Sequence, residues 1–376
     1  MRVCLDITQL VREPRRSGIQ RAERELMRHW PRPGELVPCC FDPGLSEMRE
    51  LPRAVMDELC ADAPPGGLQE ELCRLARHLA EPGPVIPRSE PLLCAELFDD
   101  RPRAEHYVHR KTDPVFWLVY DFLPWLHPEW FTTSPGAALM PYIRAMRAVP
   151  HHAFISAATQ RDFADRVVRR PCAGPVIPLG ADGIGLQRQR FDPAKREFVM
   201  LGTLEARKNA AAAMLAFRRL WDEGVDASLT LIGATEKDAR EEQALARELA
   251  AYASFRHVER LPDAGVRDAL SRARAMLFPS EGEGYGIPPM EALHAGIPVI
   301  VWSGLPALED MPALGQIRLA EITPDSIAVA VRSMLDDAMA ARLWAEAETM
   351  PTPTWREFAA HIAAWITDRA PVPARR

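Results

Sequence analysis

The fold is decided by the stretch Phe278-Pro-Ser-Glu-Gly-Glu-Gly-Tyr-Gly-Ile-Pro-Pro-Met-Glu-Ala-Leu-His-Ala-Gly-Ile-Pro-Val-Ile-Val301. It leaves an apolar strand, passes through a glycine-rich turn and enters a helix that opens with two prolines. Glu283 and Glu291 lie on either side of that turn. Backbone N–H groups in such turns and at helix N-termini bind phosphate, and carboxylates accept hydrogen bonds from hydroxyl groups. The stretch therefore predicts a site for a nucleotide-sugar.

Short apolar strands and helices alternate on both sides of this stretch. The predicted strands of the second half lie at 197–202, 228–233, 275–278 and 297–302, and the predicted helices at 209–222, 237–253, 266–273, 288–294 and 324–336. Such an alternation predicts a parallel sheet covered by helices on both faces. Ligands of such sheets bind at the carboxyl ends of the strands, and the glutamate stretch follows a strand directly.

The first half of the chain begins with the same alternation. Residues 2–8 alternate as a strand does, and 17–30 form an amphipathic helix in which Ser17 and Gln20 make a capping box. Further strands are predicted at 115–120 and 152–157. Residues 32–105 are rich in proline and charge, and only helices near 52–60 and 68–79 are assigned there. The two halves predict two doubly wound α/β domains, joined near 178–196.

Composition excludes several classes of protein. The chain has 376 residues, a formal net charge of −6 and 47% hydrophobic residues, whereas a nucleic-acid-binding protein is expected to carry a basic excess. No apolar run approaches the roughly 18 residues that span a bilayer, and the first residues do not read as a signal peptide. The seven cysteines form no C-x-x-C pair, which favours reduced thiols. We therefore expect a cytoplasmic protein without a nucleic-acid partner.

The motifs, taken in order, resemble the retaining GT-B glycosyltransferases of family 4. The resemblance rests on MLGTLEARKN (200–209), LTLIGA (229–234) and FPSEGEGYGIPPMEALHAGIPVI (278–300). In the first half, LDITQL, SGIQRAERE and YDFLPWLHPEWF (120–131) resemble a subgroup of bacterial polysaccharide and lipopolysaccharide transferases. Residues 32–105 match no motif.

The resemblance implies the GT-B fold, with two Rossmann-like domains that face a central cleft. Residues 1–178 would form an acceptor-binding domain and 179–354 a nucleotide-sugar-binding domain. A helix at 355–370 would cross back to the first domain, the alternative being an ordinary terminal helix on the second.

The resemblance assigns roles to residues of the second domain. Arg207 and Lys208 neutralise the diphosphate, so that no metal is expected. Glu283 contacts the donor sugar, and we disfavour a covalent nucleophile there because the leaving diphosphate can itself deprotonate the acceptor. Glu291, in the first turn of its helix, binds the ribose hydroxyls. Backbone groups approach the donor at the glycine positions and their neighbours: Gly202, Gly284, Tyr285, Gly286 and Ile287. The structural alternative for this last set is a tight strand-to-helix turn.

The expected contacts from the first domain are Gly18, Arg21, Tyr120 and Asp121. Gly18 stands where the family's glycine-rich loop meets the diphosphate, although Ser17 replaces the common second glycine. Arg21 reaches a phosphate or the acceptor, or simply belongs to a solvated helix face. Tyr120 stands where relatives carry a histidine that contacts the sugar. Asp121 orients the acceptor or acts as a base, or else caps a turn.

The implied activity is transfer of a sugar, with retention, from a nucleoside-diphosphate donor that could be GDP-mannose. The acceptor would be a polysaccharide or a lipid-linked glycan, and the resemblance implies peripheral contact with the inner face of the membrane. No cofactor is expected besides the nucleotide-sugar co-substrate. Two alternatives stay open: a catalytically silent paralogue that binds nucleotide-sugar within a polysaccharide assembly, and a nucleotide-sugar epimerase.

Overall fold

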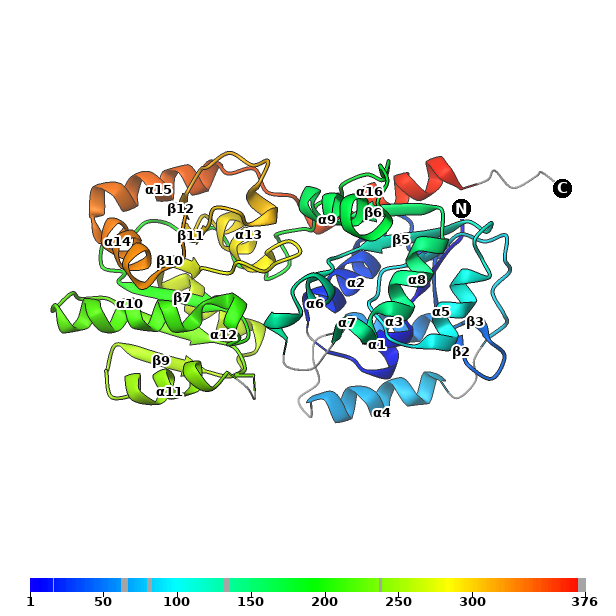
Figure 1. Ribbon diagram of the computed structural model, residues 1–376, viewed down its shortest axis with the longest axis horizontal. Coiled ribbons are helices and arrows are strands. Elements are labelled where there is room, and N and C mark those ends of the chain that lie inside the picture. The colour runs from blue at the N-terminus through cyan, green and yellow to red at the C-terminus, as the bar shows by residue number, and fades with distance from the viewer. Residues whose placement is uncertain (16, 62–66, 80–82, 132–134, 237–238, 371–376) are drawn as a thin grey trace. The chain divides into compact units, whose positions relative to one another are not determined.

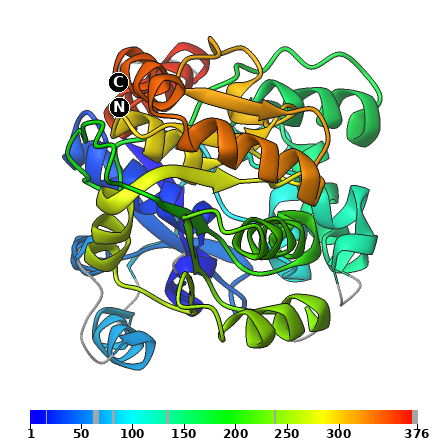
Figure 2. The ribbon, with the colours of Figure 1, turned by 90° about the vertical axis from the view of Figure 1, so that its left-hand side faces the viewer.

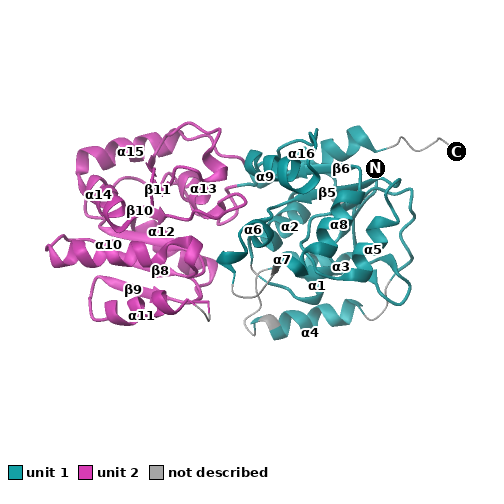
Figure 3. Cartoon of the chain, viewed as in Figure 1, with its two compact units in different colours: residues 1–180, 354–376 teal, residues 181–353 magenta. Residues whose placement is uncertain are grey.

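The chain forms two compact units in the computed structural model (Figure 3). Unit 1 comprises Met1–Gly180 and Thr354–Arg376, and unit 2 comprises Ala181–Pro353. The structure describes residues 1–15, 17–61, 67–79, 83–131, 135–236 and 239–370. The start of the helix that the sequence predicts at 237–253 lies outside these residues.

The sheet of unit 1 has six strands in the order β3-β2-β1-β4-β5-β6. All neighbours pair in parallel except β2 and β3, which are antiparallel. The central strands are buried, because helices cover both faces of such a sheet. The strands are β1 (Val3–Asp6), β2 (Leu36–Asp42), β3 (Glu47–Glu50), β4 (Leu92–Cys94), β5 (Val115–Val119) and β6 (His151–Phe154).

The helices of unit 1 are short, apart from α2, α4 and α16 (Figure 1). They are α1 (Thr8–Arg12), α2 (Gly18–His29), α3 (Arg53–Cys60), α4 (Gly67–Leu79), α5 (Arg101–Val108), α6 (Leu123–Leu126), α7 (Pro135–Ala138), α8 (Met140–Ala148), α9 (Ala157–Asp162) and α16 (Trp355–Arg369). Single turns of 3₁₀-helix at Pro33–Glu35 and Pro128–Trp130 and a π-helical turn at Phe163–Val168 complete the unit.

The sheet of unit 2 is parallel throughout, in the order β12-β11-β10-β7-β8-β9. Its strands are β7 (Glu197–Leu201), β8 (Ser228–Ile232), β9 (Phe255–Val258), β10 (Ala273–Phe278), β11 (Val299–Trp302) and β12 (Gln316–Leu319). Helices pack around it, as the view of unit 2 in Figure 2 shows. They are α10 (Ala210–Asp222), α11 (Arg240–Leu249), α12 (Asp263–Arg272), α13 (Ile287–His294), α14 (Pro324–Leu335) and α15 (Asp337–Thr349).

The two sheets share one topology. Numbered within each unit, the strands follow the order 3-2-1-4-5-6, so the direction of winding reverses between the first and fourth strands. These switch points are β1/β4 in unit 1 and β7/β10 in unit 2. Ligands of doubly wound sheets bind beside the carboxyl ends of the strands at such a point. The prediction of two doubly wound α/β halves is confirmed.

Helix α16 is part of unit 1 although unit 2 precedes it in the chain. Its N-terminus carries a full capping box between Thr354 and Glu357. The helix packs against α2, and Trp365 meets Phe116 of β5 edge-to-face, with ring centroids 5.1 Å apart.

Two details of unit 1 differ from the sequence-based expectation. Strands β2, β3 and β4 and the start of α5 lie in 32–105, where only two helices were expected. The capping box at the start of α2 is only half formed. Ser17 Oγ accepts from the Gln20 N–H, but the buried Gln20 side-chain amide donates to the Glu13 carbonyl at 3.0 Å. Across the described ranges, no helix combines the length and apolar character needed to cross a bilayer.

Candidate functional site

Two loops meet at the β7/β10 switch point of unit 2. The first leaves β7 through Gly202, whose φ of +137° favours glycine, and reaches a 3₁₀ turn at Ala206–Lys208. The second leaves β10 and enters α13 at Ile287. Because β7 and β10 are parallel neighbours, both loops leave the same edge of the sheet.

Hydrogen bonds join the two loops. The Arg207 carbonyl accepts from the Glu281 N–H at 3.0 Å. The Asn209 side-chain amide donates to the Pro279 carbonyl at 3.1 Å, and the Arg207 guanidinium donates to the Gly282 carbonyl. Residues about 75 positions apart in the sequence are thereby fixed beside one another.

A compact charge cluster forms where the loops meet. Glu283 pairs with Lys208, and its Oε1 lies 3.7 Å from the Arg207 guanidinium. Arg207 also pairs with Glu205 at 2.6 Å. These four side chains are only 10–16% exposed, and the Lys208 ammonium lies 5.2 Å from the centre of the Phe278 ring. Three residues predicted for the site are therefore brought together.

Glu205 is a member of this cluster that the sequence reasoning missed. Burial raises the pKa of its carboxyl, while Arg207 and Lys208 act in the opposite direction. Its position inside the quoted MLGTLEARKN motif, two residues before Arg207, was the available signal. The cluster thus balances two cations with two carboxylates, and an arriving anion competes with the acids for the cations.

The turn before α13 has the backbone conformation that the sequence predicts. Gly286 caps the helix at a φ of +112°, and a Cβ there would lie 2.9 Å from Leu305. The next helical residues include Pro288 and Pro289, which have no N–H. Donors toward a phosphate therefore come from the turn at 284–286 and from Ile287, rather than from the whole first turn of the helix. The Tyr285 ring is buried.

Glu291 corrects one expectation. It is the fifth residue of α13, because the helix starts at Ile287, and so it lies beyond the first turn. Its side chain is 2% exposed. Glu291 and Glu283 both belong to the connection from β10 into α13, and Glu283 forms ion pairs with Arg207 and Lys208.

The predicted residues of unit 1 occupy two places. Gly18 is the first residue of α2 and Arg21 lies one turn further on, half-buried. Tyr120 and Asp121 follow β5. Asp121 accepts from the Leu123 N–H at 3.1 Å, which is the geometry of a turn cap. His127 stacks on Trp130 with ring centroids 4.0 Å apart, in keeping with a structural role.

The β1/β4 switch point of unit 1 holds a buried ionic network. Arg103 pairs with Asp6 at 2.6 Å and also with Glu96. Asp6 ends β1 and Glu96 follows β4, and all three side chains are buried. Glu23 of α2 is also fully buried nearby, where it interacts electrostatically with Glu96 and Arg103.

Glu23 and Glu96 are absent from the sequence-based site. A signal for Glu23 existed, because it falls on the apolar face of the helix predicted at 17–30, between Ala22 and Leu26. An acid on that face is unusual, since unpaired acids are almost never fully buried.

Comparison with known proteins concerns mainly unit 2. Residues 186–350 match the family model of the glycosyl transferases group 1. Unit 2 therefore resembles the group 1 glycosyltransferases. The matched residues include the whole glutamate stretch, whereas Arg207 and Lys208 lie near the start of the match.

Curated relatives of the chain include two mannosyltransferases. The serotype-specific mannosyltransferase WbdA of Escherichia coli is 30% identical over 146 residues, which are 38% of this chain and 17% of WbdA. A GDP-mannose-dependent alpha-(1-6)-phosphatidylinositol dimannoside mannosyltransferase of Mycobacterium tuberculosis is 29% identical over 202 residues, which are 50% of this chain and 51% of that enzyme. The chain therefore spans between about a sixth and a half of these relatives' length.

Solved structures extend the likeness to the first unit. HepE of Anabaena, in complex with UDP and glucose, aligns with a TM-score of 0.66 at 13% identity and covers 98% of this chain and 99% of its own. The sucrose-phosphate synthase of Thermosynechococcus elongatus aligns with a TM-score of 0.59 at 15% identity, covering 82% and 80%. At these identities the likeness shows the fold, which is the GT-B fold that the sequence predicts.

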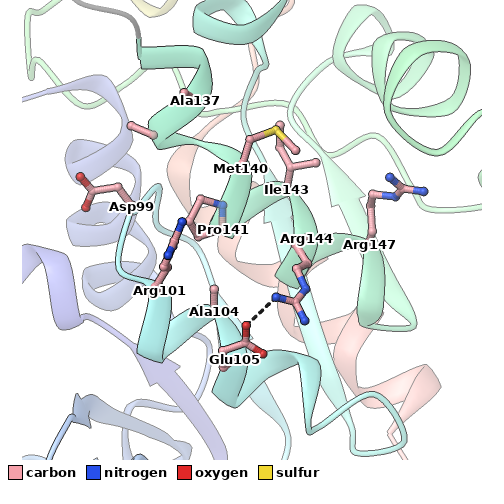
Figure 4. Close-up of a pocket in the computed structure, with 11 residues that line it drawn as sticks. Asp99, Arg101, Ala104, Glu105, Ala137, Met140, Pro141, Ile143, Arg144 and Arg147 are labelled. Atoms are coloured by element: carbon pink, nitrogen blue, oxygen red, sulfur yellow. Dashed lines mark hydrogen bonds and ion pairs between the residues drawn. The ribbon is translucent and has the colours of Figure 1, made fainter.

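Unit 1 also has an open cavity of about 920 Å³ between α5 and α8 (Figure 4). Its wall mixes small apolar side chains with arginines, and Arg144 pairs with Glu105 across it. None of the predicted site residues lines it. Within the described ranges, no group of three or more histidine, cysteine or acidic side chains is arranged to hold a metal ion.

Proposed function

We propose that this protein is a retaining glycosyltransferase that moves a sugar from a nucleoside-diphosphate donor to an acceptor hydroxyl. The observation that carries the proposal is the cluster in which Arg207 and Lys208 meet Glu283. Two cations beside a glycine-rich turn suit the diphosphate of a donor. They also lie where nucleotides bind in doubly wound sheets.

Glu283 and the diphosphate compete for the same cations. A diphosphate carries more negative charge than one carboxylate, and its oxygens can also accept from the turn at 284–286. The donor therefore displaces Glu283 from Lys208. The released carboxylate then accepts from a hydroxyl of the donor sugar, which couples sugar recognition to diphosphate binding.

The chemical step needs charge stabilisation more than a nucleophile. The bond from the sugar's anomeric carbon to the phosphate oxygen breaks, and the acceptor oxygen bonds to that carbon from the same face. The acceptor proton passes to the leaving diphosphate. Arg207 and Lys208 stabilise the negative charge that develops on this leaving group, which is the role that a metal ion has in other transferases.

The remaining contacts fix the nucleotide. Glu291 is buried in α13 beside the turn, and a carboxylate there can accept from both ribose hydroxyls. Gly202 and Gly286 let the main chain approach the donor closely. Unit 1 is proposed to bind the acceptor, with Gly18 and Arg21 at the start of α2 as its contacts toward phosphate.

The relatives favour a mannosyl donor. Two of them are named as mannosyltransferases, and one as GDP-mannose-dependent. We therefore propose GDP-mannose as the donor and a glycan or lipid-linked sugar as the acceptor. The enzyme would act in the cytoplasm, in peripheral contact with the membrane that presents the acceptor.

A panel of GDP-, UDP-, ADP- and dTDP-sugars tests the proposal by calorimetric titration of the full chain. One donor should bind, and Lys208→Ala should weaken it at least tenfold. Arg218→Ala is the matched control, because Arg218 lies on α10 and makes an exposed ion pair with Glu248 at 2.9 Å. Its affinity for the donor should equal that of the wild type.

Turnover separates the proposal from its alternatives. Transfer to membrane extract, followed with a radiolabelled donor, should give a product whose new linkage keeps the anomeric configuration. A donor that binds without transfer or hydrolysis would favour a silent paralogue. Conversion of the donor into its epimer would favour an epimerase. If no donor binds, the proposed enzymatic function is wrong.

A further inference from the structure

A second, smaller cavity opens at the β1/β4 switch point of unit 1. Its volume is about 200 Å³. Helix α1 contributes Gln9 and its C-cap Glu13, α2 and its N-cap contribute Ser17, Gln20 and Glu23, and the segment after β4 contributes Glu96. The cavity therefore occupies the position at which a doubly wound sheet binds its ligand, and no role proposed above uses it.

Glu23 is the unusual residue of this cavity. Its side chain is fully buried, and among the described residues neither carboxyl oxygen has a hydrogen-bond partner. A buried polar group left unpaired destabilises the folded protein. Burial, followed by the nearby charge of Glu96, raises the pKa of Glu23 well above its ordinary value. This shift favours the protonated carboxyl, which has one hydrogen-bond donor and one acceptor.

Glu96 faces the same cavity in a different state. Its two oxygens accept from the backbone N–H groups of Gln9 at 2.9 Å and Leu10 at 2.7 Å, and Arg103 pairs with it. This network holds the carboxyl of Glu96 in place near Glu23, whose carboxyl has no hydrogen-bond partner among the described residues. The two acids thus present one fixed acceptor and one available donor.

Tyr120 adds a third polar group. It is 3% exposed, and its hydroxyl has no hydrogen-bond partner in the described part of the chain. Burial raises the pKa of the Tyr120 hydroxyl, and the electrostatic influence of nearby Glu23 acts in the same direction. Two buried side chains, one on α2 and one directly after β5, therefore have unused hydrogen-bonding capacity near each other.

The lining selects a neutral, hydroxyl-rich ligand. Three acids, Glu13, Glu23 and Glu96, line the cavity, and they oppose a phosphate. Among the described residues, the cation that lines it is Arg15, which is exposed and pairs with Glu13. A volume near 200 Å³ is below the roughly 300–1,000 Å³ of pockets for drug-sized ligands. One sugar ring fits such a space, whereas a nucleotide or an oligosaccharide does not.

We infer that this cavity binds the terminal sugar ring of the acceptor, with Glu23 and Glu96 hydrogen-bonded to its hydroxyls. The inference rests on the proposed transferase function, and it makes Glu23 a residue that determines acceptor specificity. Glu23 donates to one hydroxyl and accepts from another, while Glu96 accepts only.

Saturation-transfer NMR with methyl glycosides of mannose, glucose, galactose and rhamnose tests the site on the full chain without a donor. At least one glycoside should give a signal with the wild type. Glu23→Gln, which keeps a donor and an acceptor, should retain it, and Glu23→Met should weaken the affinity at least tenfold. Glu105→Met, in the separate cavity between α5 and α8, is the matched control and should bind as the wild type does.

A second variant guards against misfolding. Ile19→Trp places a large ring at a half-buried position that lines the cavity, and it should abolish the signal by filling the space. Absence of any signal with the wild type, or an undiminished signal in both Glu23→Met and Ile19→Trp, overturns the inference. The donor titration above tests the transferase function independently. If a donor binds and no glycoside does, the sugar site in this cavity is wrong and the transferase function stands. If a glycoside binds and no donor does, the transferase function alone is wrong.

Discussion

The two switch points have the same strand order and opposite chemistry. In unit 2, Arg207 and Lys208 are balanced by Glu205 and Glu283 at a partly exposed edge. In unit 1, the fully buried Arg103 pairs with Asp6 and Glu96. Among the described residues, the carboxyl oxygens of Glu23 have no hydrogen-bond partner. The topology therefore decides where a ligand can bind, and the loops and the first helical turns decide which ligand it is.

The largest expected effect concerns the cations of unit 2. Lys208→Ala should lower kcat/KM for the bound donor about 100–1,000-fold, as loss of one pre-organised charge-stabilising donor does. Initial rates with the donor identified by titration provide the measurement. Arg218→Ala should stay within twofold of the wild type. An unchanged kcat/KM in Lys208→Ala would leave the switch point of unit 2 without its proposed role.

The second effect distinguishes the role of Glu283 from the roles of Arg207 and Lys208. Glu283→Gln removes a charge-assisted hydrogen bond to the donor sugar, so kcat should fall about 10–100-fold. The same change removes the carboxylate that competes for Lys208, so free nucleoside diphosphate should bind a few-fold more tightly. Parallel losses of transfer and of diphosphate affinity would contradict the competition between Glu283 and phosphate.

The third effect is a core mutation that should stabilise the protein, whereas most core mutations lower the free energy of unfolding. Glu23→Met replaces an unpaired buried acid with an apolar side chain of similar length, so it should stabilise unit 1 by about 1–3 kcal/mol. Each kcal/mol corresponds to roughly 2–4 °C in Tm for a unit of this size. Calorimetry of the full chain gives the comparison. Glu25→Met, on the same helix, removes an acid that pairs with Arg28 and His29, and it should gain nothing or lose stability.

The smallest effect is a pH dependence. Burial raises the pKa of Glu96 from its usual 4.5 to about 7, so the folded protein holds a proton there that the unfolded chain releases at lower pH. The stability linked to this group is present below pH 4.5 and is lost as the pH rises toward 7. Asp6, Glu23 and Arg103 face the same carboxyl. Urea titrations between pH 4.5 and 7.5 measure the free energy of unfolding. This free energy should decline less with rising pH in Glu96→Gln than in the wild type.

The sequence predicts the second unit far better than the first. In unit 2, the strands β7, β8, β10 and β11 are apolar runs, and each is followed by a segment whose apolar residues recur as in a helix. These local signals agree with the final fold. In unit 1, β2 contains Pro38, and β4 is only three residues long behind Pro91. Proline and short length conceal a strand whose formation depends on pairing with β1.

The candidate site divides in the same way. Arg207, Lys208 and Glu283 were found because each lies inside a contiguous motif that resembles a known family. Glu23 and Glu96 come from separate elements, and no motif connects them. Their proximity arises only when α2 and the end of β4 pack at one edge of the sheet, and that tertiary contact leaves no local pattern.

The placement of α16 sets an order for folding during synthesis. All residues of unit 2, 181–353, are consecutive, so this unit can fold as soon as it leaves the ribosome. Unit 1 must wait, because Trp355, Phe358 and Trp365 of α16 are buried in it but are made last. Until then α2 and Phe116 lack their covering helix. The nascent chain therefore carries a complete unit 2 while unit 1 still lacks α16.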